Sequence, residues 1–465
     1  TMSNKAICIC MVILSIGLAQ CSTLNVSQNS SIQLQLDGAN PGDIILVGDG
    51  TFYENILINK SIILRSINGA VIDGLGNDGT ITLAEDGIML EGFTIKNSSS
   101  QGINIMSNSN ILRNNTVEDC QIGIDVIDSN GNIIEANTIR SNEYNGVVLQ
   151  NSSNISLNYN YIYSNIARGL EIKDGQYNSI KGNNVSDNGE EGIYIENSKR
   201  DSISENLLLN NSDGIFLASS ESIITNNSIG KNRAYGAMIS NLVNGSFDSD
   251  YLYNNQENGA YITGGQLIMI HGNNASDNGD DGIDIVESNN NIILENQACN
   301  NKNVGIYFMV IENNTIKGNK ALNNTIGMAF NNANNTSILE NFVDLNQWRG
   351  MSFESNSNNN TIINNAIGKS GLGMVFLEST HNKIKNNTIN NSVAGAALQQ
   401  SLYNNILNNN VISNIIGLYL NRSDNNMIGE NRFDDNEVGL AINVSANNAL
   451  ENRTFTNNRY NMLIN

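Results

Sequence analysis

Short runs of alternating apolar and polar residues follow a repeated glycine along most of this chain. The glycine and its run recur every 21 to 23 residues. Successive side chains of a strand point to opposite faces, so each Gly-Φ-x-Φ run, where Φ is apolar, predicts a short strand with one buried face. The glycines in phase are Gly102, Gly123, Gly146, Gly169, Gly192, Gly214, Gly236, Gly259, Gly282, Gly305, Gly327, Gly350, Gly373, Gly395, Gly417 and Gly439.

The repeat predicts an all-β fold, a single-stranded right-handed parallel β-helix of about 19 coils. Each coil holds three strands joined by turns. One coil cannot bury its apolar face alone, so stacking must create the core. We expect the repeated glycine to adopt a positive φ in a turn, or to allow two backbones to approach closely.

Asparagine recurs in phase as well, in two columns that we interpret as structural. Asn tolerates left-handed turn geometry and bonds the neighbouring backbone, and stacked amides can bond from coil to coil. One column includes Asn115, Asn137, Asn160, Asn183, Asn206, Asn227, Asp250, Asn273, Asn296, Asn319, Asn341, Asn365, Asn387, Asn409 and Asn431. The other includes Asn142, Asn165, Asn188, Asn211, Asn232, Asn255, Asn278, Asn301, Asn324, Asn346, Asn414 and Asn436.

The pattern divides the chain into three parts. Residues 1–21 have the layout of a signal peptide, and Cys21 follows a sequence similar to a lipobox, so a lipid anchor there is an alternative to plain cleavage. Residues 22–101 predict an N-terminal cap, with Ser31–Leu36 as a helix or strand, and irregular first coils. Residues 102–465 form the regular repeats. We expect a secreted or cell-surface protein, periplasmic in a host with an outer membrane, without a transmembrane span in the mature chain.

The composition and the net charge argue against several classes of function. The chain has 465 residues, of which 91 are Asn and 41 are Gly, and a net charge of −21. This charge argues against binding to nucleic acid, which requires clustered Lys and Arg. The spacing of Cys and His lacks the pairs of a structural zinc site. Cys120 and Cys299 are eight repeats apart, too far for a disulfide, so we expect both to be free.

The sequence resembles the NosD-like β-helix proteins over nearly the whole mature chain, through its N-terminal motifs and its glycine and asparagine repeats. The resemblance rests on Pro41-Gly42-Asp43-Ile44, on Gly50-Thr51-Phe52-Tyr53, on Val71-Ile72-Asp73-Gly74 and on Gly92-Phe93-Thr94-Ile95. It implies the β-helix fold. Members of that group include an accessory protein for copper insertion and many cell-surface proteins, and the same fold hosts pectate lyases, polygalacturonases and alginate epimerases. The resemblance therefore leaves the activity open.

The outward face of the glycine-led strands is the candidate binding surface. The residue two after each glycine points outward, and this column is aromatic and acidic from Glu171 to Tyr307, then mostly small. Aromatic faces stack on sugar rings and carboxylates accept hydroxyl hydrogen bonds, so we predict a structural or adhesin-like surface protein that binds polysaccharide here. The alternative is that these aromatic residues only stack along the sheet. The predicted carbohydrate-binding residues are Glu171, Tyr194, Phe216, Tyr261, Asp284 and Tyr307.

Two carboxylates on that face raise the alternative of an enzyme. Asp281 and Asp284 flank Gly282, and glycosidases use two carboxylates, one with a raised pKa. The corresponding reactions are those of a polysaccharide lyase, a glycoside hydrolase or a C5-epimerase. However, the Asp-Pro-His motif of the epimerases is absent, and a solvated acidic turn also produces such pairs.

We expect no cofactor and no metal site. Calcium is the first alternative, because Asp277, Asp280, Asp281 and Asp284 offer oxygen ligands. A copper accessory protein is a further alternative that fits less well, because copper prefers Cys, Met and His. The methionines are scattered, and His271 and His381 lie about five coils apart.

Overall fold

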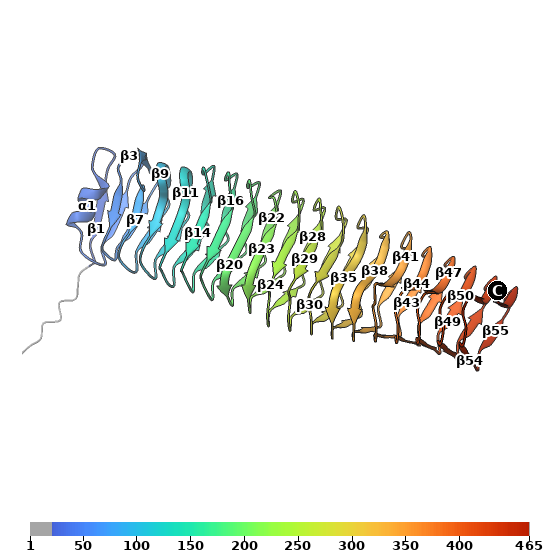
Figure 1. The fold of residues 1–465 in the computed structure, drawn as a ribbon. Helices are drawn as coiled ribbons and strands as arrows, with labels where there is room; N and C mark the ends of the chain where they lie inside the picture. The colour runs from blue at the N-terminus through green and yellow to red at the C-terminus, as the bar shows by residue number, and fades with distance from the viewer. Residues whose placement is uncertain (1–20, 465) are drawn as a thin grey trace, which may run out of the picture.

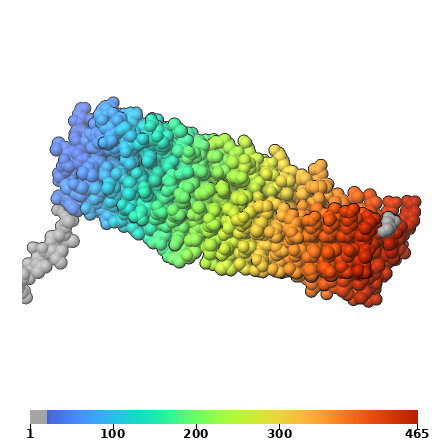
Figure 2. Space-filling view, viewed as in Figure 1, coloured from blue at the N-terminus to red at the C-terminus, as the bar shows by residue number. Residues whose placement is uncertain are grey.

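The computed structural model describes residues 21–464 and shows a long rod of stacked coils (Figures 1 and 2). The chain runs along the rod from the helix α1 (Ile32–Gly38) at one end to the strand β56 (Tyr460–Ile464) at the other. The predicted signal peptide lies outside the described residues except for Cys21, which is exposed and free. No helix between residues 21 and 464 is long and apolar enough to cross a membrane.

The coils contribute strands to three sheets, except that the first coil has the helix α1 after its single strand, and the neighbouring strands in each sheet are parallel. Sheet 1 contains 20 strands, so the rod has one coil more than predicted. Its strands are β1 (Thr23–Val26), β2 (Ile44–Val47), β5 (Ile63–Ser66), β8 (Met89–Glu91), β10 (Ile111–Arg113), β12 (Ile133–Glu135), β15 (Ser156–Asn158), β18 (Ser179–Lys181), β21 (Ser202–Ser204), β24 (Ile223–Thr225), β27 (Ser246–Asp248), β30 (Met269–His271), β33 (Ile292–Leu294), β36 (Thr315–Lys317), β39 (Ser337–Leu339), β42 (Thr361–Ile363), β45 (Lys383–Lys385), β48 (Asn405–Leu407), β51 (Met427–Gly429) and β54 (Ala449–Glu451).

Sheet 2 follows after one corner of the coil and is built mainly of three-residue strands. The longer strands β9 (Thr94–Ile105) and β11 (Thr116–Ile127) pass from sheet 2 into sheet 3. The other strands of sheet 2 are β3 (Thr51–Tyr53), β6 (Val71–Asn77), β13 (Thr138–Arg140), β16 (Tyr161–Tyr163), β19 (Asn184–Ser186), β22 (Leu207–Leu209), β25 (Ser228–Gly230), β28 (Tyr251–Tyr253), β31 (Asn274–Ser276), β34 (Gln297–Cys299), β37 (Lys320–Leu322), β40 (Phe342–Asp344), β43 (Ala366–Gly368), β46 (Thr388–Asn390), β49 (Asn410–Ile412), β52 (Arg432–Asp434) and β55 (Thr454–Thr456).

Sheet 3 holds the glycine-led strands and therefore the candidate binding face. Besides β9, β11 and β56 its strands are β4 (Ile56–Ile58), β7 (Ile81–Leu83), β14 (Val147–Gln150), β17 (Leu170–Lys173), β20 (Ile193–Lys199), β23 (Ile215–Ser220), β26 (Ala237–Ser240), β29 (Ala260–Thr263), β32 (Ile283–Val286), β35 (Val304–Glu312), β38 (Ile326–Asn334), β41 (Arg349–Glu354), β44 (Leu372–Leu377), β47 (Ala394–Gln399), β50 (Ile416–Asn421) and β53 (Val438–Asn443). The parallel β-helix predicted from the repeat is confirmed.

The core consists of the inward side chains of all three sheets, stacked on like neighbours in adjacent coils. Phe308, Phe330, Phe353 and Phe376 are fully buried, and their successive ring centres lie 4.9, 4.6 and 4.7 Å apart. Stacking at the coil spacing buries the two inner rings against two others and the two outer rings against one, which gives the aromatic ladder both its apolar burial and its stacking energy.

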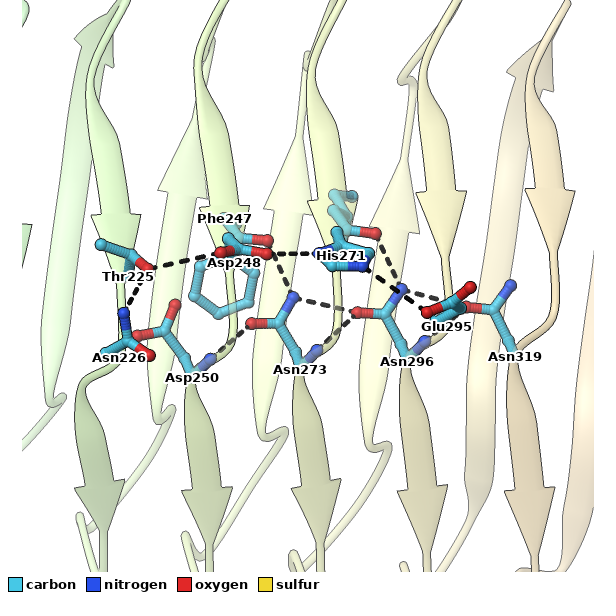
Figure 3. A network of polar contacts seen from close by, with 11 residues as sticks. Thr225, Asn226, Phe247, Asp248, Asp250, His271, Asn273, Glu295, Asn296 and Asn319 are labelled. Atoms are coloured by element: carbon cyan, nitrogen blue, oxygen red, sulfur yellow. Dashed lines mark hydrogen bonds and ion pairs between the residues drawn. The ribbon is translucent and has the colours of Figure 1, made fainter.

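The predicted asparagine ladders are confirmed. The Nδ2 of Asn273 donates to Asn296 Oδ1 at 3.0 Å and to the Phe247 carbonyl at 2.8 Å, and Asn296 repeats this contact with Asn319 (Figure 3). These asparagines do not themselves adopt the left-handed conformation expected of them. The residue before each asparagine adopts the left-handed conformation instead, as Ala136 (φ 52°) does before Asn137. The chain turns sharply at this preceding residue, so that the asparagine amide can point inward.

The repeated glycines allow the backbones of adjacent coils to approach closely, and they do not adopt a positive φ. None of the sixteen is among the described residues with positive φ. A Cβ built on Gly259 would lie 2.5 Å from the carbonyl oxygen of Gly282 and 2.7 Å from Asn278 Nδ2. The coil spacing therefore leaves no room for a side chain at this corner.

Replacement of Gly259 by alanine should lower the free energy of unfolding by about 1–3 kcal/mol, because overpacking forces the next coil away. Chemical denaturation followed by circular dichroism measures it. Gly79→Ala is the control, since a Cβ there would meet its nearest atom, Gln101 O, at 3.6 Å, an ordinary contact. Equal losses in the two variants would contradict the close-approach explanation.

The segment expected to cap the first coil is a helix. Ser31 is the N-cap of α1, and Ile32 and Leu36 are buried in the core. Glu54 accepts hydrogen bonds from the Ile32 and Gln33 amides at 2.9 and 3.0 Å. At the other end Lys60 Nζ donates to the Asp37 carbonyl at 2.7 Å. Side chains of the first coils thus satisfy backbone groups that a helix leaves unpaired at each end.

Candidate binding face on sheet 3

The six predicted carbohydrate-binding residues lie in one column on the outside of sheet 3. The strand register pairs Glu171 with Tyr194 and Tyr194 with Phe216, then passes through Met238 to Tyr261. Tyr261 pairs with Asp284, which pairs with Tyr307. Neighbours in this column are one coil apart, so the side chains form a continuous strip along the rod.

The strip begins with a network of charges around Arg168. The guanidinium lies 2.7 Å from Glu171, 2.8 Å from Glu191 and 3.7 Å from the centre of the Tyr194 ring. Lys173 forms a second ion pair with Glu171 at 2.6 Å. Burial works to raise the pKa of Glu171, but Lys173 and Arg168 outweigh it and lower the pKa. The network therefore keeps this carboxylate ionised and its charge compensated.

Aromatic side chains continue the strip beyond this network. Tyr194 and Phe216 stack with ring centres 4.7 Å apart and planes within 6°. Tyr235, which precedes a repeat glycine, lies 5.8 Å from the Tyr261 ring. Burial and a hydrogen bond to Glu257 raise the pKa of Tyr235 to about 12. The rings are half-buried, so each still presents an apolar surface to solvent.

Asp281 and Asp284 lie near one another and are more buried than the sequence suggested, at 6% and 8% exposed. Asp281 Oδ1 accepts a hydrogen bond from the Val304 amide at 2.7 Å. Asp284 Oδ1 is buried without a hydrogen-bond partner. Burial raises the pKa of each to about 7; Asp280 adds to the shift of Asp281, and Asp281 adds to that of Asp284.

A cleft further along the same face escaped the sequence prediction. It has a volume of about 400 Å³ and lies where the outward column becomes small, over β41 to β50. Arg349 at one end donates to Ser352 Oγ at 2.9 Å and lies 3.9 Å from the centre of the Trp348 ring. Tyr419 stands at the other end. The run of small residues was the signal in the sequence, because consecutive small side chains leave a hollow between larger ones.

The oxygen ligands proposed for calcium do not gather into a site. Within residues 21–464, no group of three or more His, Cys, Asp or Glu side chains is placed to hold a metal ion. Asp277 and Asp280 are exposed, whereas Asp281 and Asp284 are buried. The acidic cluster therefore spreads over the turn and the strand and does not surround one point.

Two family models match this chain. The family model of NosD, described as a periplasmic copper-binding protein, matches residues 37–213 and 346–465, more than half of the chain. The chain belongs to the NosD family. A second model, the right handed beta helix region, matches residues 191–343 and 243–371 of this NosD family chain. The predicted resemblance is thus confirmed, and with it the right-handed β-helix.

Individual relatives of this NosD family chain are distant. The cell surface glycoprotein of Methanothermus fervidus is 30% identical over 160 residues, which cover 26% of this chain and 27% of that protein. The match therefore spans about a quarter of the relative's length. Among solved structures, the periplasmic alginate epimerase AlgG is 13% identical with a TM-score of 0.34 and 76% of each chain covered. The A-module of the mannuronan C-5 epimerase AlgE6 from Azotobacter vinelandii is 13% identical with a TM-score of 0.30, covering 95% of this chain and 99% of that one.

The side chains described here do not fit the copper that the NosD description names. Cys120 is buried, and burial raises its pKa to about 12, which disfavours the thiolate that binds metal. His271 Nδ1 lies 2.5 Å from Asp248 Oδ1 (Figure 3), and His381 lies five coils away. Met328 and Met351 pair in the core but are fully buried. These residues therefore do not come together as a set of copper ligands.

Proposed function

We propose that this chain is an exported surface protein that binds polysaccharide along the outer face of sheet 3. The observation that carries the proposal is the continuous strip from Glu171 to Tyr307, which contains four half-buried aromatic rings, the methionine Met238 and two carboxylates. Such rings offer flat apolar surfaces for sugar faces, and carboxylates beside them accept hydroxyl hydrogen bonds. The β-helix supplies a rigid rod on which these groups repeat at the coil spacing.

The family and the relative support a location outside the cytoplasm. The NosD description includes the word periplasmic, and the Methanothermus fervidus relative is named a cell surface glycoprotein. The signal peptide predicted from residues 1–21 points the same way. Periplasmic, secreted and lipid-anchored forms all agree with this location.

A glycan array on the mature protein tests the proposed binding, with detection of reaction products in the same wells. Tyr261→Ala should weaken the binding of the glycan found at least tenfold, because it removes a stacking ring from the middle of the strip. Tyr161→Ala is the matched control, since Tyr161 is 57% exposed but lies on β16 in sheet 2. Absence of binding to any glycan, or equal losses in both variants, would contradict the proposal.

A second candidate, hydrolysis, elimination or epimerisation of the polysaccharide, is favoured by one observation. Asp281 and Asp284 both have a pKa of about 7, so near neutral pH one can hold a proton while the other has lost it, as general acid–base chemistry requires. Reaction products that disappear in both Asp281→Asn and Asp284→Asn would support catalysis. Binding of a glycan without reaction products would contradict catalysis and favour the function of a binding protein.

A further inference from the structure

The cleft on the outer face of sheet 3 encloses about 400 Å³ between Arg349 at one end and Tyr419 at the other. The register leads from Ser352, in the coil of Arg349, through two further coils to Tyr419. The ends are therefore roughly 14 Å apart at about 4.8 Å per coil. Pockets of about 300–1,000 Å³ hold small organic ligands, so this cleft has room for one sugar ring with its substituents.

The Tyr419 ring has no aromatic neighbour in its column. Its register partners are Ala397 in the preceding coil and Ala441 in the following one. Tyr194 differs, because it stacks on Phe216. Within residues 21–464, the Tyr419 side chain forms neither a ring contact nor a hydrogen bond. Stacking along the sheet therefore does not account for this half-buried ring, and it is available to a ligand in the space over Ala397.

The floor of the cleft is apolar. Leu372, Leu377 and Ala397 line it and are half-buried, so part of each side chain still faces the open space. Val375 and Ala394 complete this part of the lining and are buried. Burying an unpaired polar or charged group costs free energy, so the floor favours a methyl group of a ligand over a hydroxyl or an ammonium group.

Side-chain amides stand at the edge of this apolar floor. Gln399 and Gln400 line the cleft and are exposed, and among the described residues neither side chain forms a hydrogen bond. Gln399 is the register partner of Leu377, which places it beside the floor. A carboxamide has donors on its nitrogen and an acceptor oxygen, so Gln399 can donate to the carbonyl of a ligand amide and accept from its N–H.

The charges of the lining favour a neutral ligand. Arg349 forms an ion pair with Glu354 and donates to Ser352 Oγ at 2.9 Å, so its charge is compensated. Glu378 also lines the cleft, is exposed, and forms no ion pair in the part of the chain that the structure describes. A uronate or a sulfated sugar would therefore meet an uncompensated negative charge without a free cation to offset it.

We propose that the cleft between Arg349 and Tyr419 binds a 2-acetamido sugar, a sugar ring that carries an N-acetyl group. The inference rests on the proposed polysaccharide binding to sheet 3 and names the class of sugar. The ring would lie over Ala397 against Tyr419, with the acetyl methyl on the two leucines of the floor and the amide paired with Gln399. A glycan is favoured over an apolar peptide because the cleft lies in the same outward column as the aromatic strip, beyond Tyr307.

The test measures the binding of three β-1,4-linked tetrasaccharides to the mature protein by isothermal titration calorimetry at one pH and ionic strength. They consist of N-acetylglucosamine, glucosamine and glucose, and they differ only in the substituent at the 2-position. The N-acetylglucosamine oligomer should bind at least tenfold more tightly than the other two. Equal binding of the N-acetylglucosamine and glucose oligomers, or tighter binding of the glucosamine oligomer, would overturn the inference.

Ala397→Leu fills the cleft without removing a polar group, so it should weaken binding of the N-acetylglucosamine oligomer at least tenfold. Ala441→Leu is the matched control, because Ala441 is also half-buried but lies on the other side of Tyr419 and is not part of the cleft lining. Its effect should remain within twofold. Equal losses in the two variants would contradict binding in the cleft. Circular dichroism of both variants shows whether the β-helix is intact.

Gln399→Leu keeps the length of the side chain and removes its amide, so it should abolish the preference for the N-acetylglucosamine oligomer over the glucose oligomer. Gln150→Leu is the control for this change. Gln150 is exposed on β14 and, like Gln399, follows its repeat glycine by four residues. A preference that survives in Gln399→Leu as fully as in Gln150→Leu would show that the acetamido group is not recognised in the cleft.

The inference and the proposed function fail in different ways. If the oligomers bind with a dependence on Tyr261 and none on Ala397, the polysaccharide proposal stands and the acetamido inference is wrong. If no tetrasaccharide and no glycan of the array binds, the polysaccharide proposal fails as well. Binding of a peptide of alternating leucine and serine, but of no glycan, with a dependence on Ala397 would overturn the inference in favour of a protein partner.

Discussion

Replacement of Asn404 by alanine is expected to lower the free energy of unfolding by about 3–5 kcal/mol, because it interrupts a buried ladder of amides. Asn404 Nδ2 donates to the Ser379 carbonyl at 3.0 Å and to Asn426 Oδ1 at 3.2 Å. Its Oδ1 accepts from the Asn382 amide at 2.9 Å and from Asn382 Nδ2 at 3.1 Å. Alanine would leave groups in the coils on both sides buried without partners, at about 1–3 kcal/mol each.

The neighbouring residue provides the matched control. Asn405 is exposed on β48, and Asn405→Ala makes the same chemical change without touching the ladder. Chemical denaturation should show a large loss for Asn404→Ala and a change within about 0.5 kcal/mol for Asn405→Ala. Hydrogen exchange should show the loss first in the adjacent coils, since contacts in a solenoid join nearest neighbours. Similar stability of both variants would mean that the ladder contributes little.

Replacement of Asp250 by asparagine is expected to stabilise the protein at neutral and alkaline pH. Asp250 occupies a ladder position, and its backbone amide donates to Asn273 Oδ1 at 2.9 Å (Figure 3). Its Oδ1 accepts hydrogen bonds from the Asn227 amide at 2.7 Å and from Asn227 Nδ2 at 2.8 Å. Its Oδ2 is buried without a partner. An amide nitrogen in that place can donate to Asn273 Oδ1 in the next coil, just as Asn227 Nδ2 donates to Asp250 Oδ1 and Asn273 Nδ2 donates to Asn296 Oδ1.

The contribution of Asp250 to the stability of the folded protein decreases as the pH rises. Burial raises the pKa of Asp250 from its ordinary value of 3.8 to about 7 in the folded protein. Between these values the unfolded chain loses the proton while the folded chain holds it, so the contribution of Asp250 to stability is complete below about pH 4. It declines as the pH rises to about 7 and is constant above that. At about 1.4 kcal/mol per pH unit the total is on the order of 4 kcal/mol.

Denaturation of the wild-type protein and Asp250→Asn across this pH range separates Asp250 from the other buried carboxylates. The difference between the two should be small near pH 4, grow toward pH 7 and then remain constant. Asp435→Asn is the control, since Asp435 is exposed and has a positive φ that asparagine tolerates. A difference that is independent of pH would show that Asp250 is ionised in the folded protein.

Much of the architecture follows from the sequence alone. The 21- to 23-residue spacing of glycine and the alternation after it determine the coil, because strand periodicity and a fixed turn pattern are local properties. The amide ladders follow for the same reason, since a residue repeated once per coil must stack on itself. The outward direction of Tyr194, Phe216 and Tyr261 is also local, because alternate residues of a strand face opposite sides.

The solvent exposure of each outward side chain depends on the tertiary structure and could not be predicted from the sequence. Asp284 occupies an outward position, yet it is 8% exposed because Tyr261 and Tyr307 flank it from other coils. The cleft between Arg349 and Tyr419 likewise depends on side chains separated by whole coils. Burial, pKa and the space for a ligand depend on the sizes of neighbours some 22 residues away, and these become neighbours only when the coils stack.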